Sequence, residues 1–80
     1  MDTMAELRVG DNAVVSESKV GGGMGLRLRD IGLIPGTAVS CVAKSPLGDP
    51  VAFFIRGAVI ALRSEELSCI YVKRLEGQAI

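Results

Sequence analysis

The stretch that decides the fold class is Val51-Ala52-Phe53-Phe54-Ile55-Arg56-Gly57-Ala58-Val59-Ile60-Ala61-Leu62. Bulky apolar side chains recur at every second position on both sides of Gly57, and this period is typical of strands with one buried face. The pattern predicts a strand over residues 51–56, a turn at Gly57 and a second strand over residues 58–62. The side chains that it directs towards the core are Val51, Phe53, Ile55, Ile60 and Leu62.

Three further segments have the same period of two and are predicted to be strands. They cover residues 13–20, 37–43 and 69–74, and the turn-forming run at residues 45–50 separates the second of them from the strand at residue 51. Their expected inward side chains are Val14 or Val15, then Val39, Cys41 and Ala43, and finally Ile70 and Val72.

One segment has helical spacing instead. Met24, Leu28 and Ile31 stand at i, i+4 and i+7, which predicts a short helix over residues 24–31 that packs this stripe against the core. The glycines of residues 21–23 precede it and predict a flexible loop, because glycine costs the most backbone entropy to order. A short helix is therefore inserted between the first two strands of the chain.

Single helical turns are predicted at two further places, residues 3–6 and 64–67. The first has the Ser/Thr-x-x-Glu spacing of a capping box, in Thr3 and Glu6. About five short strands with one inserted helix predict a mainly β fold, a small antiparallel barrel. A chain of 80 residues has room for one core only, so we expect a single domain over residues 1–80.

Composition narrows the class of protein. Nine basic and nine acidic side chains give no net charge, whereas nucleic-acid binders of this size usually carry a basic excess. The first residues lack the basic and apolar regions of a secretory leader, and no apolar run approaches the roughly 20 residues that span a bilayer. We therefore expect a cytoplasmic protein that does not bind nucleic acid or insert into the membrane.

Three blocks of the sequence resemble one known family. The blocks are Arg27-Leu28-Arg29-Asp30-Ile31-Gly32-Leu33-Ile34-Pro35-Gly36-Thr37, Ser45-Pro46-Leu47-Gly48-Asp49-Pro50 and Ala61-Leu62-Arg63-Ser64-Glu65-Glu66-Leu67. In this order and spacing they are similar to segments of the FeoA proteins, and the similarity covers residues 5–74. The resemblance implies an SH3-like barrel and a cytosolic accessory of bacterial ferrous-iron uptake that binds the FeoB-type transporter.

The resemblance leaves a second function open. The same fold also forms a C-terminal module of iron-dependent repressors, and a fold does not fix a function. The alternative hypothesis is therefore a free-standing regulatory module related to that repressor domain.

Catalysis and tight metal binding are not expected. The chain has no histidine, its two cysteines are not in a CxxC pair, and Cys41 falls on the inward face of its strand while Cys69 falls outward. We predict no catalytic residue, no cofactor, no metal site and no disulfide between these cysteines. The oxygen ligands available to iron show no spacing that would bring them together: Asp30, Asp49, Glu65 and Glu66.

The remaining function is binding to a protein partner, and it requires an exposed surface. If Met24, Leu28 and Ile31 face the core, Leu26 and Arg29 lie on the opposite side of the helix, and exposed apolar residues beside arginine suit an interface. Phe54 is turned outward on its strand. We predict Leu26, Arg29 and Phe54 as partner-binding residues, against the alternatives of a solvated helix face and a single exposed aromatic of no consequence.

Overall fold

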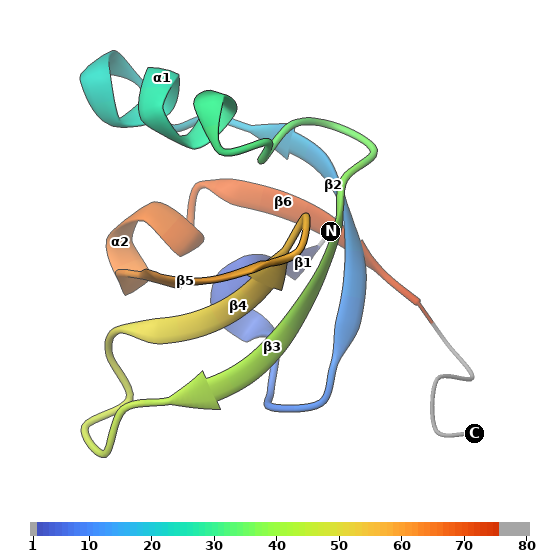
Figure 1. Cartoon of the computed structure of the whole chain (residues 1–80), viewed down its shortest axis with the longest axis vertical. Coiled ribbons are helices and arrows are strands. Elements are labelled where there is room, and N and C mark those ends of the chain that lie inside the picture. Colours follow the sequence, from blue (N-terminus) through green and yellow to red (C-terminus); the bar gives the residue numbers. More distant parts are fainter. Residues whose placement is uncertain (1, 76–80) are drawn as a thin grey trace.

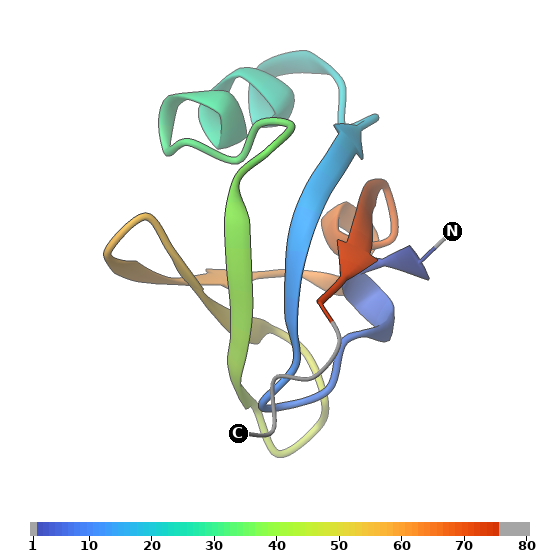
Figure 2. The same cartoon turned by 90° about the vertical axis from the view of Figure 1, so that its right-hand side faces the viewer.

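The computed structural model describes residues 2–75, which form one antiparallel sheet of six strands in the order β1-β6-β2-β3-β4-β5 (Figure 1). Two helices accompany the sheet. The β4–β5 hairpin runs across the direction of β2 and β3, so the sheet curls around its core (Figure 2). The elements are β1 (Asp2–Thr3), the 3-10 turn η1 (Met4–Glu6), β2 (Asn12–Ser18), α1 (Gly22–Asp30), β3 (Ala38–Lys44), β4 (Val51–Ile55), β5 (Ala58–Leu62), α2 (Ser64–Leu67) and β6 (Ile70–Arg74).

The predicted strands are present, and most of their inward side chains form the core. Phe53 is fully buried at the centre of β4, and Ile70 is fully buried at the start of β6. Ile60 is partly buried and packs against the core from β5. The other strand residues that were predicted to face inward are also buried, Ala43 excepted. They are Val15, Val39, Cys41, Val51, Ile55, Leu62 and Val72.

Ala43 was predicted to face inward and is instead exposed. The pairing of β3 with β4 shifts register between Cys41 and Ala43, which is the mark of a β-bulge. One extra residue on the bulged strand reverses the side-chain alternation beyond it. In the sequence, the alternation of side chains continues unbroken from Val39 to Ala43. The sequence alone therefore does not indicate that Ala43 is turned outward.

The N-terminal segment differs from the prediction. Thr3 makes no side-chain capping bond, and with Asp2 it forms β1, a sixth strand paired with β6. Met4 is buried in the core. Arg74 holds this segment in place, because its guanidinium bonds the carboxylates of Asp2 at 3.0 Å and Asp11 at 3.1 Å. Strand pairing and burial of Met4 thus replace the predicted capping box.

The helix α1 differs from the prediction in its start and in its buried face. It begins at Gly22, inside the run predicted to be a flexible loop. Gly25 allows the helix to pack closely on the connection that follows β2, since a Cβ there would lie 2.3 Å from the Val20 carbonyl oxygen. Of the predicted stripe only Leu28 is buried; Met24 is 39% exposed and Ile31 is partly buried. The helix therefore packs on the core through one residue and leaves the other two at its margin.

The end of α1 is fixed by a Schellman motif. The N–H of Gly32 donates to the Arg29 carbonyl and that of Leu33 to the Leu28 carbonyl, both at 2.9 Å. Gly32 has a φ of 96°, as this motif requires. A Cβ at Gly32 would also lie 2.0 Å from Cδ of Arg56, whose side chain crosses over this glycine. Arg56 belongs to the β4–β5 turn, so this contact ties the hairpin to the end of α1.

Candidate interaction groove

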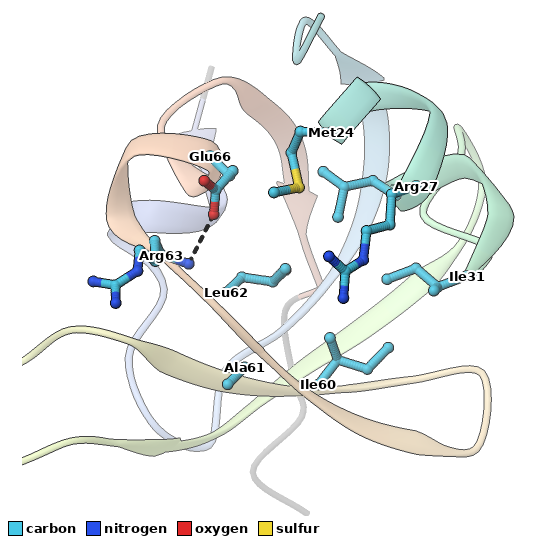
Figure 3. A pocket seen from close by; sticks show the side chains of 9 residues that line it. Met24, Arg27, Ile31, Ile60, Ala61, Leu62, Arg63 and Glu66 are labelled. Carbon is cyan, nitrogen blue, oxygen red and sulfur yellow. Dashed lines mark hydrogen bonds between the residues drawn. The ribbon is translucent and has the colours of Figure 1, made fainter. Parts of the chain in front are cut away.

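A groove of about 280 Å³ lies between α1 and the segment formed by β5 and α2 (Figure 3). One wall belongs to the helix and consists of Met24, Arg27, Leu28 and Ile31. The other wall consists of Ile60, Ala61, Leu62, Arg63 and Glu66. We call this feature the α1–β5 groove. It has an apolar floor with charged side chains at its margin.

The helical spacing explains one wall. Residues 24, 27, 28 and 31 lie on one side of α1 because they are separated by three or four positions. Figure 3 shows the Arg27 guanidinium pointing from α1 towards β5, with the Met24 thioether beside it above Leu62. The partial exposure of Met24 and Ile31 now has a structural reason, since they line a groove rather than a closed core.

The second wall is held by polar contacts at the start of α2. The Arg63 N–H donates to Oε1 of Glu66 at 3.0 Å. The Ser64 N–H and hydroxyl donate to the two carboxylate oxygens of Asp49, at 2.9 and 3.1 Å. Asp49 lies in the β3–β4 connection, within the second of the three sequence blocks, residues 45–50. It therefore holds the start of α2, which lies in the third block, residues 61–67. These bonds satisfy amides that would otherwise be unpaired at a helix start.

The margin of the groove is basic. Arg27 and Arg63 contribute two guanidinium groups, and Glu66 contributes one carboxylate that is bonded to a main-chain amide. Within residues 2–75, neither arginine forms an ion pair. In Figure 3 the Arg27 guanidinium lies over the apolar floor and that of Arg63 points away from it, so a guanidinium beside an apolar floor suits an apolar segment that carries an acidic side chain.

The structure places the three predicted interface residues away from this groove. Leu26 is 57% exposed and Arg29 is exposed, both on the other side of α1. Arg29 borders a separate hollow next to Val20. Phe54 is 46% exposed and borders a third hollow, beside Arg56. The predicted exposure of all three is confirmed, their role in binding stays a prediction, and they do not form one surface.

Sequence reasoning missed the groove because it assigned Met24 and Ile31 to the core. One signal was available. The first block contains Arg27, Leu28 and Ile31, and the third contains Ala61, Leu62, Arg63 and Glu66. Seven of the groove's nine lining residues come from these two blocks.

Reactive side chains lie elsewhere. Both cysteines are free thiols, Cys41 buried as predicted in β3 and Cys69 half-buried after α2. Burial raises the pKa of the Cys41 thiol and so disfavours its nucleophilic thiolate form. Among residues 2–75, no group of three or more His, Cys, Asp or Glu side chains has the arrangement to hold a metal ion. No helix in the same range is long and apolar enough to cross a membrane.

Comparison with known proteins identifies the family. The family model of the FeoA domain matches residues 3–74, which is nearly the whole chain. The chain belongs to the FeoA family. The solution structure of FeoA from Chlorobium tepidum is 32% identical, with a TM-score of 0.89 over 95% of this chain and 72% of that one.

Two further relatives connect the family with its fold and its biology. FeoA from Stenotrophomonas maltophilia, solved with zinc and described as an SH3 domain protein, is 30% identical with a TM-score of 0.78, covering 91% of each chain. An Fe(2+) transport protein A/FeoB fusion protein of Porphyromonas gingivalis is 30% identical over 76 residues. Those residues are 95% of this chain and 9% of the fusion, so the chain corresponds to a small part of that protein. The predicted mainly β, SH3-like fold is confirmed.

The fold also occurs in a different class of protein. A manganese-dependent transcriptional repressor has a TM-score of 0.80 over 91% of this chain and 40% of its own, at 22% identity. At that identity the likeness concerns the fold alone. The expectation named iron-dependent repressors, and this repressor, which shares the fold, depends on manganese.

Proposed function

We propose that this protein is a non-enzymatic, cytoplasmic accessory of ferrous-iron uptake that works by binding the cytosolic part of a FeoB-type transporter. The whole chain, residues 1–80, acts as a single FeoA-like domain with its core over about residues 5–74. The observation that carries the proposal is the Porphyromonas gingivalis relative, in which transport protein A and FeoB are one polypeptide. A linker raises the effective concentration of one module beside the other, and separate chains need an interface to achieve the same proximity.

The chemistry of the described residues supports binding rather than catalysis. The buried thiol of Cys41 has a raised pKa, and the groove offers an apolar floor with arginines at its margin. The family relative from Stenotrophomonas maltophilia is itself described as a candidate activating factor for ferrous iron transport. A small rigid domain with a groove is suited to act on a transporter by contact.

Three surfaces are candidates for that contact. The first is the α1–β5 groove, the second is the exposed pair Leu26 and Arg29, and the third is the barrel face around Phe54. Arg29 and Phe54 border hollows of their own, but the lining of the groove is more apolar than the lining of either hollow. We therefore assign the main contact to the groove.

Co-purification tests the proposal. The chain, carrying an affinity tag, is mixed with the purified soluble domain of the FeoB-type transporter encoded in the same genome. We expect a stable complex on size-exclusion chromatography. A dissociation constant of roughly 100 µM is the weakest affinity expected of a working partner, so both proteins are tested at about that concentration. If neither the soluble domain nor the detergent-solubilised whole transporter then forms a complex, the proposal is rejected.

The repressor likeness favours a second function, a free-standing regulatory module. The fold similarity covers most of this chain. In that case the chain would co-purify with a protein that contains a helix-turn-helix domain, identified by mass spectrometry, and the transporter would be absent from the eluate. A pull-down with the tagged chain from a lysate of the cells that encode it therefore separates the two functions.

A further inference from the structure

The strand β5 has a free hydrogen-bonding edge. In the part of the chain that the structure describes, residues 2–75, it is the last strand of the sheet order and pairs with β4 alone. Arg56 and Gly57 connect the two strands with positive φ angles of 49° and 86°, as in a two-residue type I′ turn. In such a turn the residues on either side, Ile55 and Ala58, exchange the closing hydrogen bonds.

The register then determines which amides point outward. Antiparallel pairs alternate between bonded and non-bonded positions, so Phe53↔Ile60 is bonded while Phe54↔Val59 and Ala52↔Ala61 are not. The main-chain N–H and C=O groups of Val59 and Ala61 therefore point away from β4. No other main-chain group among residues 2–75 bonds them. Val59 is 64% exposed and Ala61 is exposed, so a partner can reach this edge.

The α1–β5 groove runs along that edge. Side chains alternate between the two faces of a strand, so a groove on one face would be lined by every second residue. Four consecutive residues line this groove, Ile60–Arg63. The groove is therefore bounded by the edge of β5 on one side and by α1 on the other, and Figure 3 shows β5 passing below the side chains of α1.

The size and charge of the groove limit its occupant. Its volume of about 280 Å³ is at the lower end of the range for small-molecule pockets, and it holds one or two side chains rather than a helix. Arg27, whose guanidinium points towards β5, favours an acidic side chain beside the apolar one. An unpaired strand edge next to a helix is the arrangement in which domains bind extended peptides by adding a strand.

We propose that the α1–β5 groove binds an extended segment of the partner, which pairs as an additional strand with the free edge of β5 at Ala61. The segment places one apolar side chain among Met24, Leu28 and Ile60 and one acidic side chain against Arg27. The identity of the partner, a soluble segment of the FeoB-type transporter, rests on the function proposed above. The mode of binding rests on the register and the groove.

Hydrogen exchange of individual amides tests this mode. Overlapping 15-residue peptides that cover the soluble segments of the transporter are screened against the ¹⁵N-labelled chain, and the best binder is added to saturation. We expect the exchange of the Ala61 amide to slow by at least tenfold, because a new main-chain acceptor covers it, while the exposed helical amide of Leu26 is unchanged. Saturable binding that leaves Ala61 exchange unchanged would overturn the proposal.

A pair of variants at one position provides the matched control. Ala61→Pro removes the outward N–H without removing a β4 bond, and proline is tolerated on edge strands for this reason. Ala61→Ser keeps the N–H with a side chain of similar size. We expect Ala61→Pro to weaken peptide binding by tenfold or more and Ala61→Ser by less than twofold. Equal affinities for the two variants would contradict strand addition, and if Ala61→Pro does not fold, the exchange measurement on the unaltered chain decides.

The outcomes separate this inference from the function on which it rests. If the transporter domain binds and Ala61 stays unprotected, strand addition is wrong and the proposed function stands. If the transporter domain binds but no 15-residue segment does, strand addition by an extended segment is wrong and the proposed function stands, and if neither the domain nor any segment binds, the proposed function fails. Concentration-dependent dimerisation that Ala61→Pro abolishes would show that a second copy of the chain occupies the edge, which would overturn the assignment to a transporter segment.

Discussion

The two sides of α1 carry similar side chains in different surroundings. Met24 and Arg27 face β5 across a groove, and Leu26 and Arg29, on the other side, face outward. The helix thus presents an exposed apolar residue and an arginine on each side, and exposure alone does not distinguish them. The difference lies in what stands opposite: Arg29 borders a hollow next to Val20, whereas the Met24 side faces β5, whose outer edge pairs with no other strand among residues 2–75. A binding face is determined by the pair of elements that form it.

The largest expected effect concerns Leu28, the one residue of α1 that is buried. At 2% exposure, truncation of Leu28 to Ala should lower the free energy of unfolding by about 2–5 kcal/mol. Met24→Ala should cost less than about 1 kcal/mol, because Met24 is 39% exposed. Urea unfolding followed by circular dichroism measures both. Equal losses of unfolding free energy would show that Met24 belongs to the core and does not form a wall of the groove.

A smaller effect is expected from the glycines of α1. Gly25→Ala would place a Cβ 2.3 Å from the Val20 carbonyl oxygen, so the helix must shift, at a cost of about 1–3 kcal/mol. Gly23→Ala meets nothing within 4 Å and should stabilise the helix by about 0.5–1 kcal/mol. Thermal unfolding of the two variants compares them directly. A stabilising Gly25→Ala would contradict the close approach that sets the position of α1.

The smallest of these effects concerns the other wall. Asp49→Ala removes the carboxylate that accepts from Ser64 at the start of α2, and should cost about 0.5–2 kcal/mol. Asp30→Ala, an exposed aspartate on α1, should change the free energy of unfolding by no more than about 0.5 kcal/mol. Chemical denaturation resolves this difference. If the two variants are equally stable, the link between the β3–β4 connection and α2 contributes nothing.

The sequence predicted the parts of the fold that depend on local period. Phe53 and Ile55 are inward because their strand alternates without interruption, and the hairpin with β5 follows from the turn at Gly57. The segment Asp2–Thr3 was missed because a strand of two residues has no period to detect and exists only through its pairing with β6. The bulge after Cys41 was missed for a related reason, since register belongs to two strands together.

The candidate site could be predicted only in part. Phe54 was correctly expected at the surface because its strand neighbours Phe53 and Ile55 are inward, and Leu26 and Arg29 because they lie on the side of the helix opposite to Leu28. Met24 was wrongly assigned to the core, because a helical stripe does not reveal how far the opposite element extends. The free edge of β5 could not be predicted without the strand order, which places β5 at the margin of the sheet.

The most direct test of the account compares the two sides of α1 by matched double variants. Met24→Asp with Arg27→Glu changes the groove, and Leu26→Asp with Arg29→Glu makes the same kind of change on the outward side. Both reverse one arginine and replace one exposed apolar residue, so their effects on net charge are equal. In co-purification with the soluble transporter domain, we expect the first variant to lose the complex and the second to retain it, with melting temperatures of both close to that of the unaltered chain. Loss of the complex in the second variant with retention in the first would place the contact on Leu26 and Arg29 and contradict the groove.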